Sequence, residues 1–271
     1  FKNLRKIIYN KGFQIMIRKQ LSKLQKLISY YKEYRDESSI LIYQMGKVGS
    51  TSIEKSLPSS IHIHSLFNNP PCFVHLKQRR VGLLSSIEGW VADGVKRLAI
   101  KNRKNIKIIS LVRDPFKRDI SMFFQNLPQW LYEYTGTHEV DTREEGLSIL
   151  IDAFQKTYDY DYALRWFDLE LKKLTGVDIF DFDFDVSKGY LEIHSGRYSI
   201  LLLKLETISA ANGVLNEFCG QEIEIITANS GNKKWYAPVY DDFKRTAFQS
   251  DEYVGKVKQS KLYKHFYCQS D

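Results

Sequence analysis

The chain has 271 residues, of which 43% are hydrophobic and 14% aromatic, with only 15 glycines and 6 prolines. These totals exclude a disordered or low-complexity protein and predict a folded protein with a substantial core. The formal net charge of +8 favours an anionic partner, and it does not choose among nucleotide phosphates, an acidic glycan, nucleic acid and anionic lipid. The three cysteines lack metal-ligand spacing, so we expect reduced thiols and no metal site.

The first 37 residues are predicted to form a basic amphipathic helix that precedes a single domain over residues 38–271. Its apolar residues recur every three or four positions, at Ile17, Leu21, Leu24, Ile28 and Tyr31. Two interpretations stay open. The stripe packs on the domain and the charges are solvated, or the helix binds a membrane surface or a partner.

Strands and helices are predicted to alternate in the following half of the chain. The patterns indicate strands near 39–45, 60–65 and 106–112. Helices are indicated over 50–57, over 83–98 with an end in the basic segment 101–104, and over 116–127. Beyond these come two helices within 144–176, a hairpin of 190–193 with 198–203, a helix over 207–219, a strand at 222–227 and a helical tail. This order predicts an α/β fold, a three-layer sandwich whose central sheet is mainly parallel.

A glycine-containing turn follows the first predicted strand. It reads Gly46, Lys47, Val48, Gly49, Ser50 and Thr51. The glycines allow backbone amides to point at an anion, the lysine adds positive charge, and the two hydroxyls add donors. The alternative is an ordinary turn, because short motifs occur by chance. In the P-loop of nucleotide triphosphatases the lysine follows the second glycine, so the position of Lys47 argues against ATP-driven phosphoryl transfer.

A second candidate anion site lies where the third strand ends. Arg113 leaves this strand just before Asp114 and Pro115, which form a good N-cap and first turn for the next helix. Ser121 lies two helical turns further on. Because open α/β sheets bind ligands at the carboxyl ends of their strands, we expect the two candidate sites to share one edge.

This pair of motifs resembles the donor-binding motifs of sulfotransferases that use 3′-phosphoadenosine 5′-phosphosulfate (PAPS). The turn residues Lys47, Gly49, Ser50 and Thr51 match the motif that holds the 5′-phosphosulfate, and Arg113 with Ser121 matches the motif that holds the 3′-phosphate. The resemblance implies a sulfotransferase-type fold with a P-loop-like strand-loop-helix. Its form is most similar to Golgi carbohydrate sulfotransferases, although some of those carry Cys where this chain has Ser50.

The C-terminal part resembles a bacterial family of capsular polysaccharide synthesis proteins. Two segments carry this resemblance: residues 232–236, reading NKKWY, and residues 264–267, reading KHFY. Family-level reasoning implies that Asn229, Asn232, Lys233 and Lys234 close over the donor. Trp235 and Tyr236 either stack on adenine or sugar or belong to the core.

Sulfuryl transfer requires positive charge at the bridging oxygen of the donor and a base for the acceptor proton. Lys47 suits the first task. For the base we predict His64, which ends the second strand, and keep His75 and His62 as alternatives. A basic group, Lys77, Arg79 and Arg80, either meets an acidic acceptor or lies in a solvated loop.

The sequence therefore predicts a PAPS-dependent enzyme that sulfates a carbohydrate, in particular a capsular or extracellular polysaccharide or its precursor. A P-loop-type kinase and a noncatalytic capsule-assembly protein are the alternatives. Nucleic acid is not an expected partner, because no nucleic-acid-binding module is recognisable. We expect a cytoplasmic, membrane-associated protein in a bacterium, or a Golgi lumenal protein in a eukaryote if an anchor has been removed.

Overall fold

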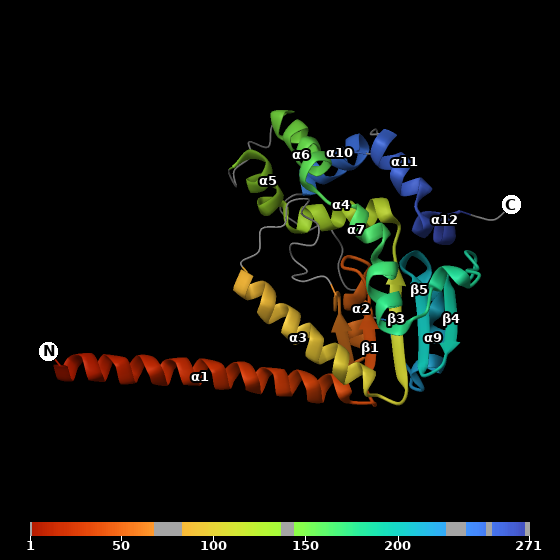
Figure 1. Ribbon diagram of the computed structural model, residues 1–271. Helices are drawn as coiled ribbons and strands as arrows, with labels where there is room; N and C mark the ends of the chain where they lie inside the picture. Colours follow the sequence, from red (N-terminus) through yellow and green to blue (C-terminus); the bar gives the residue numbers. More distant parts are fainter. Residues whose placement is uncertain (1, 68–82, 137–143, 226–236, 248–250, 269–271) are drawn as a thin grey trace.

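The computed structural model describes residues 2–67, 83–136, 144–225, 237–247 and 251–268. It is an α/β protein with a five-stranded, mostly parallel sheet flanked by helices (Figure 1), in the order β2-β1-β3-β5-β4. The parallel strands are β1 (Ile40–Tyr43), β2 (Ser60–Ile63), β3 (Ile106–Val112) and β5 (Tyr198–Lys204). The hairpin partner β4 (Tyr190–Ser195) is antiparallel to β5. The predicted α/β class and mainly parallel sheet are confirmed.

The centre of the sheet is built from continuous apolar runs, as expected for strands that are covered on both faces. Ile108 of β3 pairs with Leu41 on one side and with Ile200 on the other, and all three are fully buried. Because the four strands are parallel, their carboxyl ends lie together. We call this the carboxyl edge, made of residues 44–49, 64–67, 113–114 and 205–206.

The helices form two groups. Those close to the sheet are α1 (Lys2–Arg35), α2 (Ser50–Ser56), α3 (Leu83–Lys101), α7 (Asp161–Leu164), α8 (Lys172–Thr175), α9 (Asn212–Cys219) and α12 (Lys261–Tyr267). The others are α4 (Pro115–Gln125), α5 (Leu127–Thr135), α6 (Glu144–Thr157), α10 (Ala237–Ala247) and α11 (Asp251–Gln259). Figure 1 shows this second group above the carboxyl edge, where it encloses its own aromatic core of Phe123, Trp130, Phe154 and Phe243.

Two regions depart from the predicted elements. The strand predicted at 222–227 is absent from residues 222–225, and the last two positions lie outside the described residues. Here the amide of Ile223 donates to the side chain of Asn216 (2.8 Å), and the hydroxyl of Ser56 donates to the carbonyl of Glu224 (2.6 Å). The segment thus docks on α9 and α2 instead of pairing with a strand. The second helix predicted within 144–176 is interrupted by a π-helical turn, Phe167–Leu171.

The N-terminal helix packs differently from the prediction. It contacts α3 through Tyr30 and Tyr34, and the ammonium of Lys96 lies 4.9 Å from the centre of the Tyr30 ring and 5.7 Å from that of Tyr34. The four residues at the head of the predicted stripe, Ile17, Leu21, Leu24 and Ile28, are instead 40%, 53%, 54% and 48% exposed. The interpretation that this stripe packs on the domain is therefore wrong for these four residues, because a neighbouring stripe makes the contact.

No helix within the described ranges combines the length and the apolar character that crossing a lipid bilayer requires.

Candidate functional site

The glycine turn joins β1 to α2 in an unusual backbone conformation. Lys47 has a φ of 71°, the only positive φ outside glycine among the residues that the structure describes. A non-glycine residue pays about 1–2 kcal/mol for this left-handed conformation, and such strain is concentrated at functional sites. Gly49 has a φ of 88°, and a Cβ there would lie 2.4 Å from Cδ1 of Leu205. Conformation therefore favours glycine at position 49, and a larger residue would also force the Leu205 side chain to shift.

Two arginines hold this turn through consecutive backbone carbonyls. Nε of Arg118 donates to the carbonyl of Gly46 (3.0 Å), and Nη1 of Arg113 donates to the carbonyl of Lys47 (2.9 Å). Arg113 directly follows β3, and Arg118 lies in the second turn of α4. The two predicted anion motifs are therefore adjacent at the carboxyl edge, joined by a hydrogen bond.

Arg118 belongs to a buried polar network that the sequence analysis did not identify. The side chains of Arg118 and Asp119 are 1% and 0% exposed, with Nη1 and Oδ1 2.8 Å apart. The hydroxyls of Tyr158 and Tyr253 donate to the Asp119 carboxylate at 3.1 and 3.0 Å. Burial raises the pKa of Asp119, against the opposing effect of these partners. The only sequence signal was the position of Arg118 in the first turns of a helix that begins at this edge.

Asp114 acts as the predicted N-cap of α4. Its carboxylate accepts from the amide of Lys117 (3.0 Å), and its own amide donates to the Glu206 carboxylate (2.9 Å). The hydroxyl of Tyr267 donates to the other oxygen of Glu206 (3.1 Å). The end of β5 and the C-terminal helix α12 are thereby tied to the strand end that carries Arg113.

The remaining predicted donor residues lie close by in the fold. Ser121 is half-buried on α4, one turn beyond Arg118. Ser50 and Thr51 are the first two residues of α2, and their side chains lie outside the description. The side chain of Val48, another predicted donor-binding residue, is fully buried. Val48 can therefore contact a ligand only through its backbone.

His64, the predicted base, directly follows β2 at the same edge. Its Nδ1 lies 3.1 Å from the backbone carbonyl of Gln44, and its own carbonyl accepts from Nε1 of Trp166 (2.9 Å). Because a carbonyl only accepts, Nδ1 carries the proton, and Nε2 of the neutral ring keeps the lone pair that a base needs. His64 is exposed overall. Its pKa is nevertheless lowered, first by desolvation of the ring by surrounding protein and then by the neighbouring His62.

The alternative bases differ from His64 in their surroundings. The ring of His62 is half-buried and lies 4.3 Å from the ring of His64, centre to centre. Its Nδ1 lies 3.2 Å from the Glu54 carboxylate, so one of the two ring nitrogens already has a partner. Burial lowers the pKa of His62, and Glu54 opposes that effect. His75 lies outside the described residues.

The loop that carries His64 is held by a fully buried carboxylate, Glu170, in the π-helical turn. Its Oε2 accepts from the hydroxyl of Tyr43 (2.5 Å) and from the amides of Leu66 (2.8 Å) and Phe67 (3.2 Å). Its Oε1 accepts from the hydroxyl of Ser65 (2.9 Å). π-Helical turns are frequent at functional sites, and this one fixes residues 65–67. Sequence reasoning missed it because the pattern there reads as an ordinary helix.

Several predicted site residues fall outside the described ranges. They are the loop residues Lys77, Arg79 and Arg80 and the later group Asn229, Asn232, Lys233, Lys234, Trp235 and Tyr236. Within the described ranges, no group of three or more His, Cys, Asp and Glu side chains is arranged to hold a metal ion.

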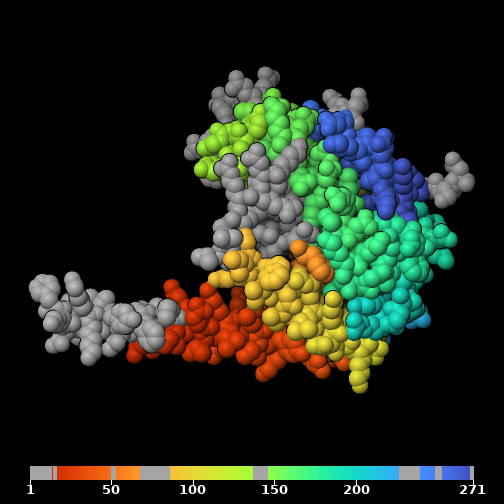
Figure 2. Space-filling view, in the orientation of Figure 1, coloured from red at the N-terminus to blue at the C-terminus, as the bar shows by residue number. Residues whose placement is uncertain are grey.

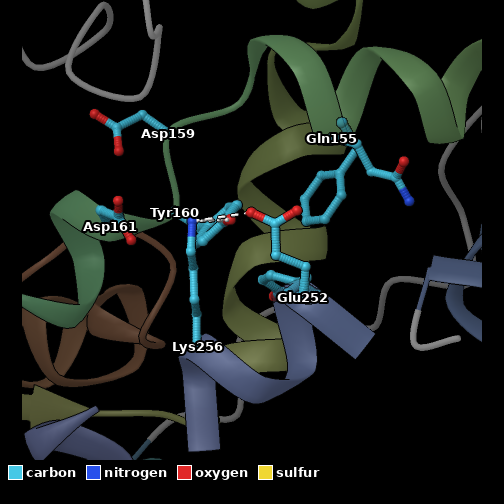
Figure 3. Close-up of a pocket in the computed structure, with 8 residues that line it drawn as sticks. Gln155, Asp159, Tyr160, Asp161, Glu252 and Lys256 are labelled. Atoms are coloured by element: carbon cyan, nitrogen blue, oxygen red, sulfur yellow. Dashed lines mark hydrogen bonds and ion pairs between the residues drawn. The ribbon is translucent and has the colours of Figure 1, made fainter. Parts of the chain in front are cut away.

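A cavity of about 200 Å³ lies away from the predicted site, between α6, α7 and α11 (Figure 3). An ion pair between Lys256 Nζ and Glu252 Oε1 (3.1 Å), four residues apart on α11, lies on the α11 side of the cavity. The lining residues are Phe154, Gln155, Asp159, Tyr160, Asp161, Glu252, Tyr253 and Lys256. None of them is a predicted donor or catalytic residue, so the cavity and the carboxyl edge are separate features. Tyr253, which lines the cavity, also donates to Asp119 of the network around Arg118.

Comparison with known proteins gives one family. Residues 139–268, just under half of the chain, match the family model described as "Putative capsular polysaccharide synthesis protein". No curated protein and no solved structure matches the chain. The matched segment is thereby associated with capsular polysaccharide synthesis, and the match specifies no activity. It contains Trp166, Glu170 and Tyr253, which support the carboxyl edge from outside the two predicted motifs.

Proposed function

We propose that this protein is a PAPS-dependent carbohydrate sulfotransferase of capsular polysaccharide synthesis, with a three-layer fold of the sulfotransferase type. The observation that carries the proposal is the hydrogen bond from Arg113 to the carbonyl of Lys47. It joins two motifs that each suit an anionic group, at the edge where open α/β sheets bind ligands. The family match over residues 139–268 supports a polysaccharide acceptor.

The residues at the carboxyl edge fit a donor that carries both phosphate and sulfate. Lys47 and Gly49 are left-handed, a conformation that occurs in the concave backbone turns that bind anions. Lys47 and Arg113 add positive charge and are only half-buried, so solvent-borne ligands can reach them. The donor would be held by the turn Gly46–Thr51, which includes Lys47, and by Arg113 with Ser121.

The donor supplies an activated sulfuryl group, whose S–O bond to the bridging oxygen breaks as a new S–O bond forms to the acceptor hydroxyl. Lys47 stabilises the negative charge that develops on the bridging oxygen. His64 accepts the proton of the acceptor hydroxyl at Nε2, the nitrogen left with a lone pair when Nδ1 donates to Gln44. The lowered pKa of His64 keeps the ring neutral, and therefore basic, at pH 7.

Donor binding is tested by calorimetry with the product nucleotide, 3′-phosphoadenosine 5′-phosphate (PAP). The informative variant is Lys47→Gly, because glycine removes the charge and also relieves the left-handed backbone, so the fold is kept or stabilised. We expect PAP affinity to fall at least tenfold in this variant. Lys55→Gly is the matched control, since Lys55 is an exposed lysine of the following helix α2. No PAP binding by the wild-type protein would refute the proposal.

Catalysis is tested by transfer of labelled sulfate from PAPS to a panel of glycans. We expect turnover in the wild-type protein. In Lys47→Gly we expect the turnover rate to fall on the order of a hundredfold. Magnesium-dependent binding of ATP in place of PAP would favour the kinase. PAP binding without transfer to any glycan, with a cellular phenotype unchanged in Lys47→Ala, would favour the noncatalytic assembly protein.

A further inference from the structure

The positive charge of the chain is concentrated on the N-terminal helix. Residues 2–35 contain ten lysines and arginines and one acidic residue, Glu33, so this helix carries +9. The whole chain carries +8, and the remainder is therefore close to neutral, at −1. The helix has 34 residues and is about 50 Å long. Figure 1 shows it extending well beyond the sheet and α3.

The same helix carries an exposed apolar stripe. Ile17, Leu21, Leu24 and Ile28 follow one another at spacings of four, three and four residues, which puts them on one line along a helix. Each is at least 40% exposed. Tyr30 and Tyr34, which pack against Lys96 of α3, are rotated from this stripe by roughly 130° around the helix axis. The contact with α3 therefore leaves the first stripe open to solvent. Figure 2 shows the coloured part of α1 projecting beyond the rest of the molecule.

We propose that α1 is a docking element for an anionic lipid surface. A lipid surface supplies both features that the helix requires, negative charge for the lysines and an apolar layer for the stripe. A second copy of the chain is the competing occupant, since the spacing of the stripe also suits a coiled-coil seam. Charge decides against it, because pairing two such helices brings like charges together without acidic partners.

The test is cosedimentation of the full chain with phosphatidylcholine vesicles that contain or lack phosphatidylserine. Binding is expected only with phosphatidylserine and is expected to weaken as salt rises. The charge variant carries Arg18→Gln, Lys19→Gln and Lys26→Gln, three exposed side chains of α1. Its control carries Lys55→Gln, Lys188→Gln and Lys258→Gln, three exposed lysines elsewhere. Both variants have the same net charge, so only the location of the charge differs.

We expect the α1 variant to lose vesicle affinity on the order of a hundredfold, and the control to lose only a few-fold. A second variant, Leu21→Gln with Leu24→Gln, keeps every charge and is expected to lose about tenfold. Equal losses in the two charge variants would overturn the proposal, as would the absence of binding to phosphatidylserine vesicles. Sedimentation velocity tests the competing occupant. If the wild-type protein is a dimer, Leu21→Gln with Leu24→Gln dissociates it, and the same variant still binds vesicles normally, the stripe belongs to an interface with a second copy instead.

Discussion

Arg113 donates a hydrogen bond to the backbone carbonyl of Lys47 across 66 positions of sequence. This contact connects the turn that follows β1 to the end of strand β3. The same guanidinium has further N–H donors, so Arg113 is able to hold the turn and meet a ligand at once. In the proposed donor site, this dual role would distinguish Arg113 from an arginine that serves only a structural carbonyl.

Replacing Arg113 by alanine is expected to weaken PAP binding. A hydrogen bond to a charged group contributes about 1.5–3 kcal/mol, which corresponds to a loss of roughly ten- to a hundredfold in affinity. Arg197→Ala is the matched control, because Arg197 also donates to backbone carbonyls, of Lys101 and Arg103, and lies at the opposite edge of the sheet. Calorimetric titration with PAP measures both. Equal affinities in the two variants would exclude Arg113 from the donor site.

Gly49→Ala is expected to disrupt the turn. The new Cβ imposes an unfavourable left-handed backbone and collides with Leu205, 2.4 Å away. The conformational part alone costs about 1–2 kcal/mol, so thermal unfolding should shift to a lower temperature. Shortening the neighbour in the double variant Gly49→Ala, Leu205→Ala should relieve the collision, and the two changes should then be less than additive. Strict additivity of the two losses would contradict the contact.

Glu170→Gln is expected to loosen the loop that carries His64. The amide has one acceptor oxygen in place of two, so at least one buried donor at this site loses its partner, at about 1–3 kcal/mol. Tyr43→Phe is the milder control, since it removes a single donor and leaves the carboxylate its other partners. Urea unfolding gives the stability, and kcat measured beside KM for PAPS separates a loop effect from a donor effect. We expect kcat to fall while this KM stays within about twofold, because the proposal assigns donor binding to the turn and not to this loop.

The lowered pKa of His64 makes a prediction for pH dependence. Protein around the ring, then His62 and Arg118, disfavour the charged form. The acid limb of kcat/KM should therefore lie below the ordinary histidine pKa of about 6.5. In the unfolded chain the ring takes up its proton near that value, and in the folded chain only at lower pH. Folding stability is thus expected to fall as the pH decreases through this window.

The measurement is a profile of kcat/KM between neutral and acidic pH, with urea unfolding at the same pH values. His64→Ala should remove most of the activity and reduce the acid-side loss of stability. His194→Ala serves as the control, because His194 is an exposed residue of β4. If His64→Ala retains full turnover, the base is another residue, and His62 and the untested His75 become the candidates.

The sequence predicted the parts of the molecule that depend on local pattern. The strand Ile106–Val112 was predicted to the residue, because five of its seven positions are apolar and the helix cap at Asp114-Pro115 follows closely. The turn at Gly46–Gly49 was predicted from its glycines, and its proximity to Arg113 followed from the rule that parallel strands share one carboxyl edge.

The supports of the site were not predictable in the same way. Glu170 reads as a polar position on a helix, and only the π-helical turn brings it beneath residues 65–67. In the sequence Arg118 is one more basic residue, and only the fold brings Asp119 together with the hydroxyl groups of Tyr158 and Tyr253 around it. Both depend on contacts between segments about 40 to 130 positions apart, and pattern rules carry no information about such pairs.

The buried network around Asp119 also has a consequence for how the protein is made. The turn at Gly46 is held by Arg118, which is paired with Asp119, and Asp119 accepts a hydrogen bond from Tyr253 near the C-terminal end. A ribosome-bound chain from which α11 has not yet emerged lacks Tyr253 as a partner, so its Asp119 carboxylate lacks one of its hydrogen bonds. The turn at Gly46 therefore reaches its final set of supporting contacts only after α11, far later in the sequence, has been synthesised.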